Sequence, residues 1–200
     1  MKKTSLFSKL FLGAAVVSLS LGIVSCKNES KPEDTKEAAE DQNEAKFDDT
    51  SKDSLADDSE YLVAAAEVDL KEIELGKLAQ TKSTNADVKA LGKMMVDQHT
   101  KSSADTKTLA QSKNISLPMA LTEKGQEAYN DLNKKSGNDF DKEYADMMVD
   151  GHKKTIEKME KAAKDAKDPQ IKQWAANMIP TLQAHLQHSE QVKAKVDAIK

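Results

Sequence analysis

The chain has 200 residues, of which 30 are basic and 34 acidic, giving a net charge of −4. Charged residues make up 32% and aromatic residues only 4%, a balance typical of soluble helical proteins rather than of β-sheet proteins. The acidic excess argues against binding to nucleic acid, whose phosphates require a basic surface. Arginine is absent, so bidentate recognition of phosphate or carboxylate is not available.

Residues 1–25 are predicted to be a secretory signal peptide, with basic Lys2-Lys3 followed by an apolar run that ends at Val24. The sequence Ile23-Val24-Ser25-Cys26 resembles the lipobox of bacterial lipoproteins, in which the signal is removed before a cysteine that then carries lipids. Cys26 is the only cysteine, so no intramolecular disulfide can form. We therefore expect an exported protein held by acylated Cys26 on a bacterial membrane, at the outer membrane or on a periplasmic face rather than in the cytoplasm; the sequence does not distinguish the inner from the outer membrane. The alternative is a chance cysteine at the end of an ordinary signal peptide.

Residues 26–54 are rich in Lys, Glu, Asp, Asn and Ser and contain one aromatic residue, Phe47. A segment of this composition is expected to bury too little apolar surface to fold. We interpret it as a disordered, solvated tether between the lipidated Cys26 and a folded domain at residues 55–200.

Apolar residues recur at helical spacing through residues 55–200 and never alternate with period two, which predicts an all-α domain. Four long helices are expected, at about residues 55–82 and 84–113, from 138, and from 169. Thr84 with Asp87 resembles a capping box, Asn138 is the expected cap of the third helix, and Asp168-Pro169 is a strong start for the fourth.

The segment between the second and third long helices, residues 114–137, is too long for a hairpin turn and contains a short helical stretch at 122–134. Such a segment suits a crossover that runs back along a four-helix bundle. The sequence therefore predicts a four-helix bundle with a crossover that contains a short extra helix.

A six-residue motif occurs twice, as Met-Met-Val-Asp-Gln-His at residues 94–99 and as Met-Met-Val-Asp-Gly-His at residues 147–152. His99, His152 and His185 each lie about 14 to 16 residues into their helices, so all three are expected at mid-height of the bundle. Each follows an apolar residue at core spacing, which places the rings on inward faces.

On the first long helix the predicted core stripe is formed by Leu62, Ala66, Leu70 and Ile73. Glu67 and Glu74 flank Leu70 and lie at the edge of this stripe. Three imidazoles with a carboxylate are a suitable ligand set for Zn, Cu or Fe. The alternative is that the histidines lie at the edge of the core, form hydrogen bonds with acids on neighbouring helices, and bind no metal.

Carboxylate-bridged di-iron sites require Glu-x-x-His on two helices, and this chain has no such motif. It also has no glycine-rich phosphate loop and no serine elbow. Oxidoreductase chemistry of the di-iron kind is therefore disfavoured.

Five motifs together resemble the bacterial domain-of-unknown-function family 4142 (DUF4142) over about residues 57–195. They are Glu72–Ala79, Met95–Lys101, Phe140–Tyr144, Gly151-His152 and Ile179–Leu186. That family is ferritin-like in fold, is described as exported or outer-membrane, and has no established activity. The resemblance implies a ferritin-like bundle and export, and it implies no enzyme.

The sequence thus predicts a membrane-anchored lipoprotein whose bundle binds a transition metal ion in metal handling or stress protection. The predicted ligands are His99, His152 and His185, with Glu67 or Glu74. The alternative is a structural or protein-interaction lipoprotein without metal, in which the polar centre only fixes helix register. Membrane lipid, bound through Cys26, and a metal ion are the expected partners.

Overall fold

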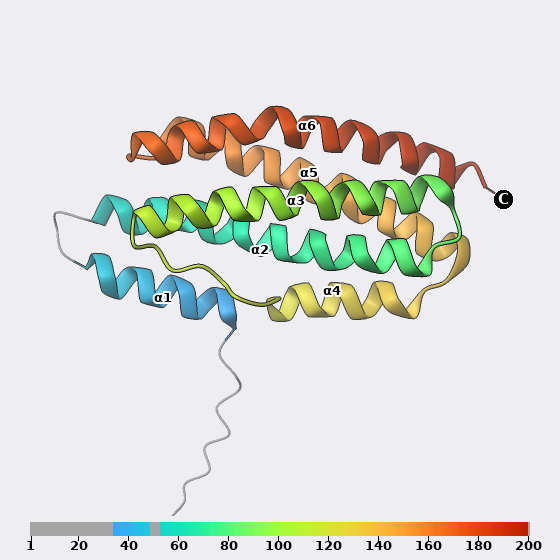
Figure 1. The fold of residues 1–200 in the computed structure, drawn as a ribbon, viewed down its shortest axis with the longest axis horizontal. Helices are drawn as coiled ribbons and strands as arrows, with labels where there is room; N and C mark the ends of the chain where they lie inside the picture. The colour runs from blue at the N-terminus through green and yellow to red at the C-terminus, as the bar shows by residue number, and fades with distance from the viewer. Residues whose placement is uncertain (1–33, 49–52, 200) are drawn as a thin grey trace, which may run out of the picture. The chain divides into compact units, whose positions relative to one another are not determined.

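The computed structural model describes residues 34–48 and 53–199 (Figure 1). Within these ranges the chain forms six α-helices and no strand, which confirms the all-α prediction. All described residues belong to one compact unit, residues 32–200. The helices are α1 (Thr35–Phe47), α2 (Asp53–Lys82), α3 (Ala86–Ser112), α4 (Glu123–Lys134), α5 (Gly137–Asp165) and α6 (Pro169–Asp197).

Helix boundaries follow local capping chemistry. Asp168 accepts hydrogen bonds from the first backbone N–H groups of α6, with Pro169 in the first turn, as predicted. Two other predicted caps were wrong by one or two residues. Asn85, not Thr84, accepts from the backbone at the start of α3, and α5 begins after Ser136 rather than at Asn138. Neighbouring polar residues can all serve as caps, so sequence alone does not choose among them.

The four long helices form two hairpins, because α2 packs mainly against α3 and α5 mainly against α6. Contacts at both ends of α3 and α6 show that these two helices run in opposite directions. At one end Lys195 pairs with Asp87 at 2.8 Å, and at the other Lys113 pairs with Asp168 at 2.5 Å. Helices α3 and α5 therefore run in the same direction. The segment that connects α3 to α5 runs back along the bundle and contains α4 (Figure 1).

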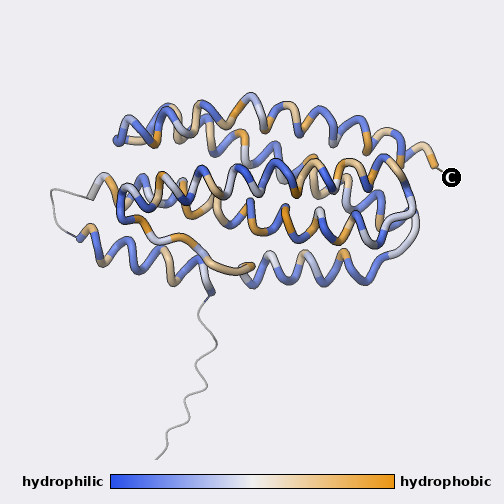
Figure 2. Tube along the Cα trace, viewed as in Figure 1, coloured by the Kyte–Doolittle hydropathy of each residue, from blue (hydrophilic) through white to orange (hydrophobic). Residues whose placement is uncertain are grey.

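Hydrophobic and hydrophilic residues are interspersed along every long helix, as expected for helices with one buried face (Figure 2). The hairpin of α2 and α3 is closely packed at Gly76 and Gly92. A Cβ atom at Gly76 would lie 2.7 Å from the carbonyl oxygen of Gly92, so the two backbones approach too closely for a side chain.

Helix α1 corrects the prediction that all of residues 26–54 form a solvated tether. Its buried residues are Ala39, Asn43 and Phe47, four apart, and together they make one inward face. The Asn43 amide accepts from the backbone N–H of Ser116 at 2.6 Å and donates to the Ser116 carbonyl at 3.0 Å. The composition was misleading because three inward residues suffice to dock a short helix on a surface formed by distant parts of the chain. The folded domain therefore includes residues 35–47, upstream of the predicted start at residue 55.

No helix in the described part of the chain combines the length and the apolar character needed to cross a membrane. The predicted signal peptide at residues 1–25, the lipidation site at Cys26, and tether residues 27–33 and 49–52 lie outside the described residues.

Candidate metal centre

Three of the four histidines come together between the two hairpins. His99 lies on α3, His152 on α5 and His185 on α6, and they are 2%, 2% and 4% exposed. One ring nitrogen from each histidine can be chosen so that all three lie within 4.8 Å of one another. The ring centroids are 5.3 to 5.6 Å apart. The rings thus converge, as their helical spacing predicted.

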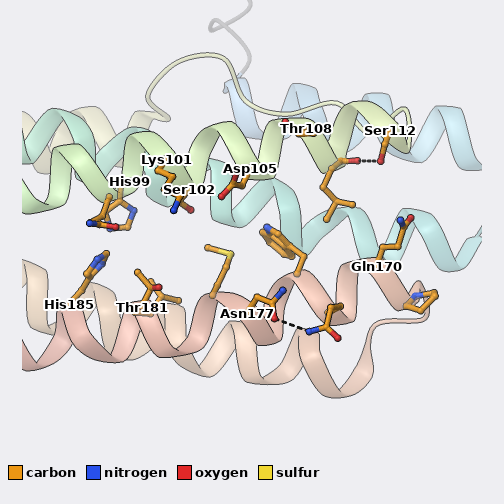
Figure 3. A pocket seen from close by; sticks show the side chains of 17 residues that line it. His99, Lys101, Ser102, Asp105, Thr108, Ser112, Gln170, Asn177, Thr181 and His185 are labelled. Carbon is orange, nitrogen blue, oxygen red and sulfur yellow. Dashed lines mark hydrogen bonds between the residues drawn. The ribbon is translucent and has the colours of Figure 1, made fainter.

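Helical periodicity explains why the rings point inward. Met95 and Met148 lie one turn before His99 and His152, and both methionines are fully buried. The methionines belong to a hydrophobic core cluster, so they pack in the interior. In Figure 3, His99 and His185 face each other across the space between α3 and α6.

A buried carboxylate orients His99. The Nδ1 atom of His99 lies 2.8 Å from Oδ1 of Asp69 on α2, and the Ser102 hydroxyl donates to Oδ2 of Asp69 at 3.0 Å. A carboxylate accepts hydrogen bonds, so Nδ1 of His99 is the donor and Nε2 carries the free lone pair. That Nε2 atom is buried and has no hydrogen-bond partner.

The other two histidines form a short chain of hydrogen bonds. Nδ1 of His152 donates to the backbone carbonyl of Met148 at 2.7 Å, which leaves the lone pair on Nε2. Nδ1 of His185 then donates to this Nε2 at 3.3 Å, and Nε2 of His185 carries the third lone pair. Both rings are therefore neutral in this arrangement, the form in which imidazole binds metals.

Burial keeps these two imidazoles uncharged. Desolvation, with a smaller contribution from the nearby His99 ring, lowers the pKa of His152 to about 4. The same causes, with His152 also contributing, lower the pKa of His185 to about 3. At neutral pH both rings can bind a cation without first losing a proton.

A second buried acid, Glu72, lies one turn beyond Asp69 on α2. Glu72 is only 1% exposed, and its Oε2 atom has no hydrogen-bond partner. Its Oε1 atom lies 3.8 Å from Nζ of Lys71. Desolvation raises the pKa of both Asp69 and Glu72. The buried Tyr144 hydroxyl on α5 also lacks a partner. Unpaired buried groups of this kind are rare and indicate a functional constraint.

The structure does not support Glu67 and Glu74 as ligands. Glu67 pairs with Lys36 on α1 at 3.2 Å, and the half-buried Glu74 pairs with Lys77 at 2.7 Å. The fourth histidine, His188, is exposed and bonds to the carbonyl of Ala184. Helix α2 is rotated from the predicted orientation, so that its acidic edge faces away from the histidines.

A signal in the sequence could have identified Asp69 and Glu72. Leu62, Asp69, Glu72 and Ala79 lie on one face at spacings of three or seven, and all are buried. Two acids at core positions of an otherwise apolar face suggest a polar partner inside. The predicted stripe used Leu70 instead, which is only half-buried.

The arrangement could hold a metal ion. Three imidazole nitrogens suit Zn, Cu and Fe, and they leave at least one coordination position for a further ligand. The orphaned Nε2 of His99 fits this interpretation, since a bound cation would satisfy its lone pair. Asp69 has the place of the carboxylate that commonly orients a metal-binding histidine. No other group of three metal-binding side chains occurs among the described residues.

No curated protein and no solved structure matches this chain. A protein-family model does match, over residues 36–192. The match begins inside α1 and ends inside α6, so it includes the docked first helix and all three converging histidines. The chain therefore belongs to the family described as Domain of unknown function (DUF4142).

Proposed function

We propose that this protein is a membrane-anchored bacterial lipoprotein whose helical domain binds one transition metal ion through His99, His152 and His185. Its role is metal handling or protection against metal-dependent stress at the cell envelope. The observation that carries the proposal is the convergence of three buried imidazole nitrogens within 4.8 Å from three separate helices.

The surroundings of the histidines support this function. Asp69 holds His99 in the tautomer that presents Nε2, and the Met148 carbonyl does the same for His152. Burial keeps two of the rings neutral at physiological pH. A divalent ion would also compensate the charge of buried carboxylates that have few partners of their own.

We also propose that the domain is a ferritin-like bundle. The two antiparallel hairpins joined by a long connection through α4 agree with the single-crossover topology of that class. The mid-helix position of the histidines is where such bundles place metal sites. The missing Glu-x-x-His pairs distinguish this ligand set from the di-iron type.

Metal analysis of the purified full-length chain tests the metal proposal. After incubation with Zn²⁺, Cu²⁺ or Fe²⁺ and removal of excess ion, about one equivalent should remain bound for at least one of them. Replacing His99, His152 and His185 by alanine should abolish this binding. His188→Ala is the matched control, because His188 is exposed and outside the cluster. Metal well below one equivalent for all three ions would reject the proposal.

The anchor is proposed from the lipobox-like sequence that ends at Cys26. Expression in a bacterium with a labelled fatty acid should give a labelled protein in the membrane fraction, and Cys26→Ser should release an unlabelled protein. A wild-type chain that carries no label and fractionates without membranes would contradict the anchor.

One observation favours a structural role without metal as the second candidate. Nδ1 of His185 donates to Nε2 of His152 at 3.3 Å, so a protein partner already uses the lone pair of that nitrogen. In that case the triple alanine variant would lose stability, the wild type would retain no metal, and any partner binding would persist.

A further inference from the structure

A groove of about 850 Å³ runs between α3 and α6 and ends at the histidine cluster (Figure 3). His99 and His185 line its inner end, whereas His152 does not line it. Asn177 and Thr181 line it from α6, and both are exposed. The groove thus joins solvent to two of the three rings that are otherwise enclosed by the fold.

The groove exists because short side chains face each other there. Ser102 and Asp105 of α3 and Asn177 and Thr181 of α6 cannot fill the distance between the two helices. The helices are tied together beyond the groove by the pair of Lys113 with Asp168 at 2.5 Å. The helices are thus joined at that end, while the short side chains leave the space between them open.

The groove has an apolar floor and a polar rim. Leu109, Trp174, Met178 and Leu182 provide the floor, and Leu182 is 3% exposed. Lys101 and Asp105 on the rim carry opposite charges that offset each other. Pockets that bind small organic ligands have volumes of roughly 300 to 1,000 Å³ and a mainly apolar lining with a few polar groups. The size and lining of this groove are typical of such pockets.

Imidazole ligands carry no charge when they bind a metal, so a divalent ion held by three of them stays cationic and keeps one coordination position open. The groove reaches His99 and His185 from solvent, so it offers an entry for a ligand to that position. The charge of the ion favours anionic oxygen donors, and the floor favours an apolar body next to them.

We propose that the groove between α3 and α6 binds a small organic anion with an apolar body, whose oxygen atoms complete the coordination of the ion held by the three histidines. This inference rests on the proposed metal binding. The protein would then bind the metal as a ternary complex with its organic ligand.

The test uses the full-length chain loaded with Zn²⁺ and titrated with benzohydroxamate, an anionic oxygen chelator with a phenyl ring. Trp174 is the only tryptophan and lines the groove, so its fluorescence reports the binding. Saturable binding is expected. It should be weaker by about tenfold or more in the metal-free chain, and weaker by about tenfold for acetohydroxamate, which lacks the ring. Zinc content is measured again after each titration to exclude extraction of the ion.

Asn177→Phe and Thr181→Phe place a phenyl group in the groove two turns and one turn before His185. At equal zinc content each should weaken benzohydroxamate binding by about tenfold or more. Gln183→Phe is the matched control, because Gln183 is exposed on α6 and does not line the groove.

The outcomes separate the two proposals. Zinc near one equivalent without saturable binding of benzohydroxamate would overturn the inference and leave the metal proposal standing. Equal affinity in the metal-free chain, or unchanged affinity in both phenylalanine variants, would overturn it in the same way. Failure of the chain to hold zinc, copper or iron would reject the metal proposal, and the inference with it.

Discussion

At the scale of single residues, Asp69 has the clearest role because its carboxylate contacts both His99 and Ser102. In Asp69→Asn the group that accepts the hydrogen bond from Nδ1 of His99 loses its negative charge. The His99 tautomer with a free lone pair on Nε2 is then less strongly favoured. Metal affinity should fall by about 10- to 100-fold, the usual effect of removing a carboxylate behind a metal-bound histidine. Competition titration against a chromogenic chelator measures this.

The control for Asp69→Asn is Asp97→Asn, since Asp97 is exposed on α3 and pairs only with Lys93 among the contacts described. Its metal affinity should equal that of the wild type. Equal affinities for both variants would show that the carboxylate of Asp69 does not act on the metal through His99.

Glu72 should destabilise the metal-free protein at neutral pH. Burial raises the pKa of Glu72 above its ordinary value of 4.5, because the folded state disfavours the ionised carboxylate. The contribution of Glu72 to the free energy of unfolding is therefore fully present below pH 4.5 and is lost as the pH rises through the raised pKa. Glu72→Gln removes the charge at similar volume and should raise the free energy of unfolding at pH 7 by about 1 to 3 kcal/mol.

Urea denaturation of the metal-free chain at pH 7 and pH 4.5 measures this gain, which should largely disappear at the lower pH. Glu74→Gln serves as control two residues away, where the side chain is 41% exposed and pairs with Lys77, so the free energy should change little. A variant at Glu72 that is less stable than the wild type at pH 7 would show that the carboxylate has a stabilising partner.

At the scale of elements, docking of α1 depends on Asn43, which satisfies both backbone groups of Ser116. Asn43→Ala leaves the half-buried N–H and carbonyl of Ser116 without these partners, which costs about 1 to 3 kcal/mol. Hydrogen exchange should therefore become faster in α1 and in residues 115–118, while α5 and α6 keep their protection.

Glu44→Ala is the control for this element, because Glu44 is exposed on α1. Its exchange pattern should match that of the wild type. If Asn43→Ala instead accelerated exchange equally in all helices, α1 would be part of a single cooperative unit rather than a separately docked element.

At the scale of the whole molecule, the buried histidines should make the metal-free fold sensitive to acid. The pKa of His185 is lowered to about 3 from the ordinary 6.5, so below pH 6.5 the unfolded chain takes up a proton that the folded chain does not. The stability contribution is therefore present above 6.5 and is lost as the pH falls. At pH 5 the loss from His185 is about 2 kcal/mol.

Urea denaturation at pH 7.5 and pH 5 checks this by comparing the metal-free wild type with His185→Gln. The variant should lose less stability between the two pH values by about 2 kcal/mol, since Asp69 and Glu72 contribute equally to both proteins. His188→Gln, at the exposed histidine, should behave like the wild type. Equal pH dependence of all three proteins would contradict neutral burial of His185.

Local patterns were sufficient to predict helices α2 to α6 and the inward position of the three histidines, but not α1. Periodicity and capping residues act over a few positions, and Asp168-Pro169 or the spacing of Met95 to His99 can be read without knowledge of the fold. Equal depth of the histidines in helices of similar length then implied that they would meet.

The spacing of Asp69 and Glu72 with Leu62 and Ala79 marks them as candidates for a buried face. Only the tertiary structure decided that they lie beside the histidines, where α1 docks and where the groove opens. A shift of one residue rotates a helical position by about 100°, so the packing of α2 on α3 determined that Asp69 and Glu72 face inward and Glu67 does not. Asn43 depends on Ser116, and the groove depends on the distance between α3 and α6. Such contacts join residues far apart in the chain, and no pattern within a single helix specifies them.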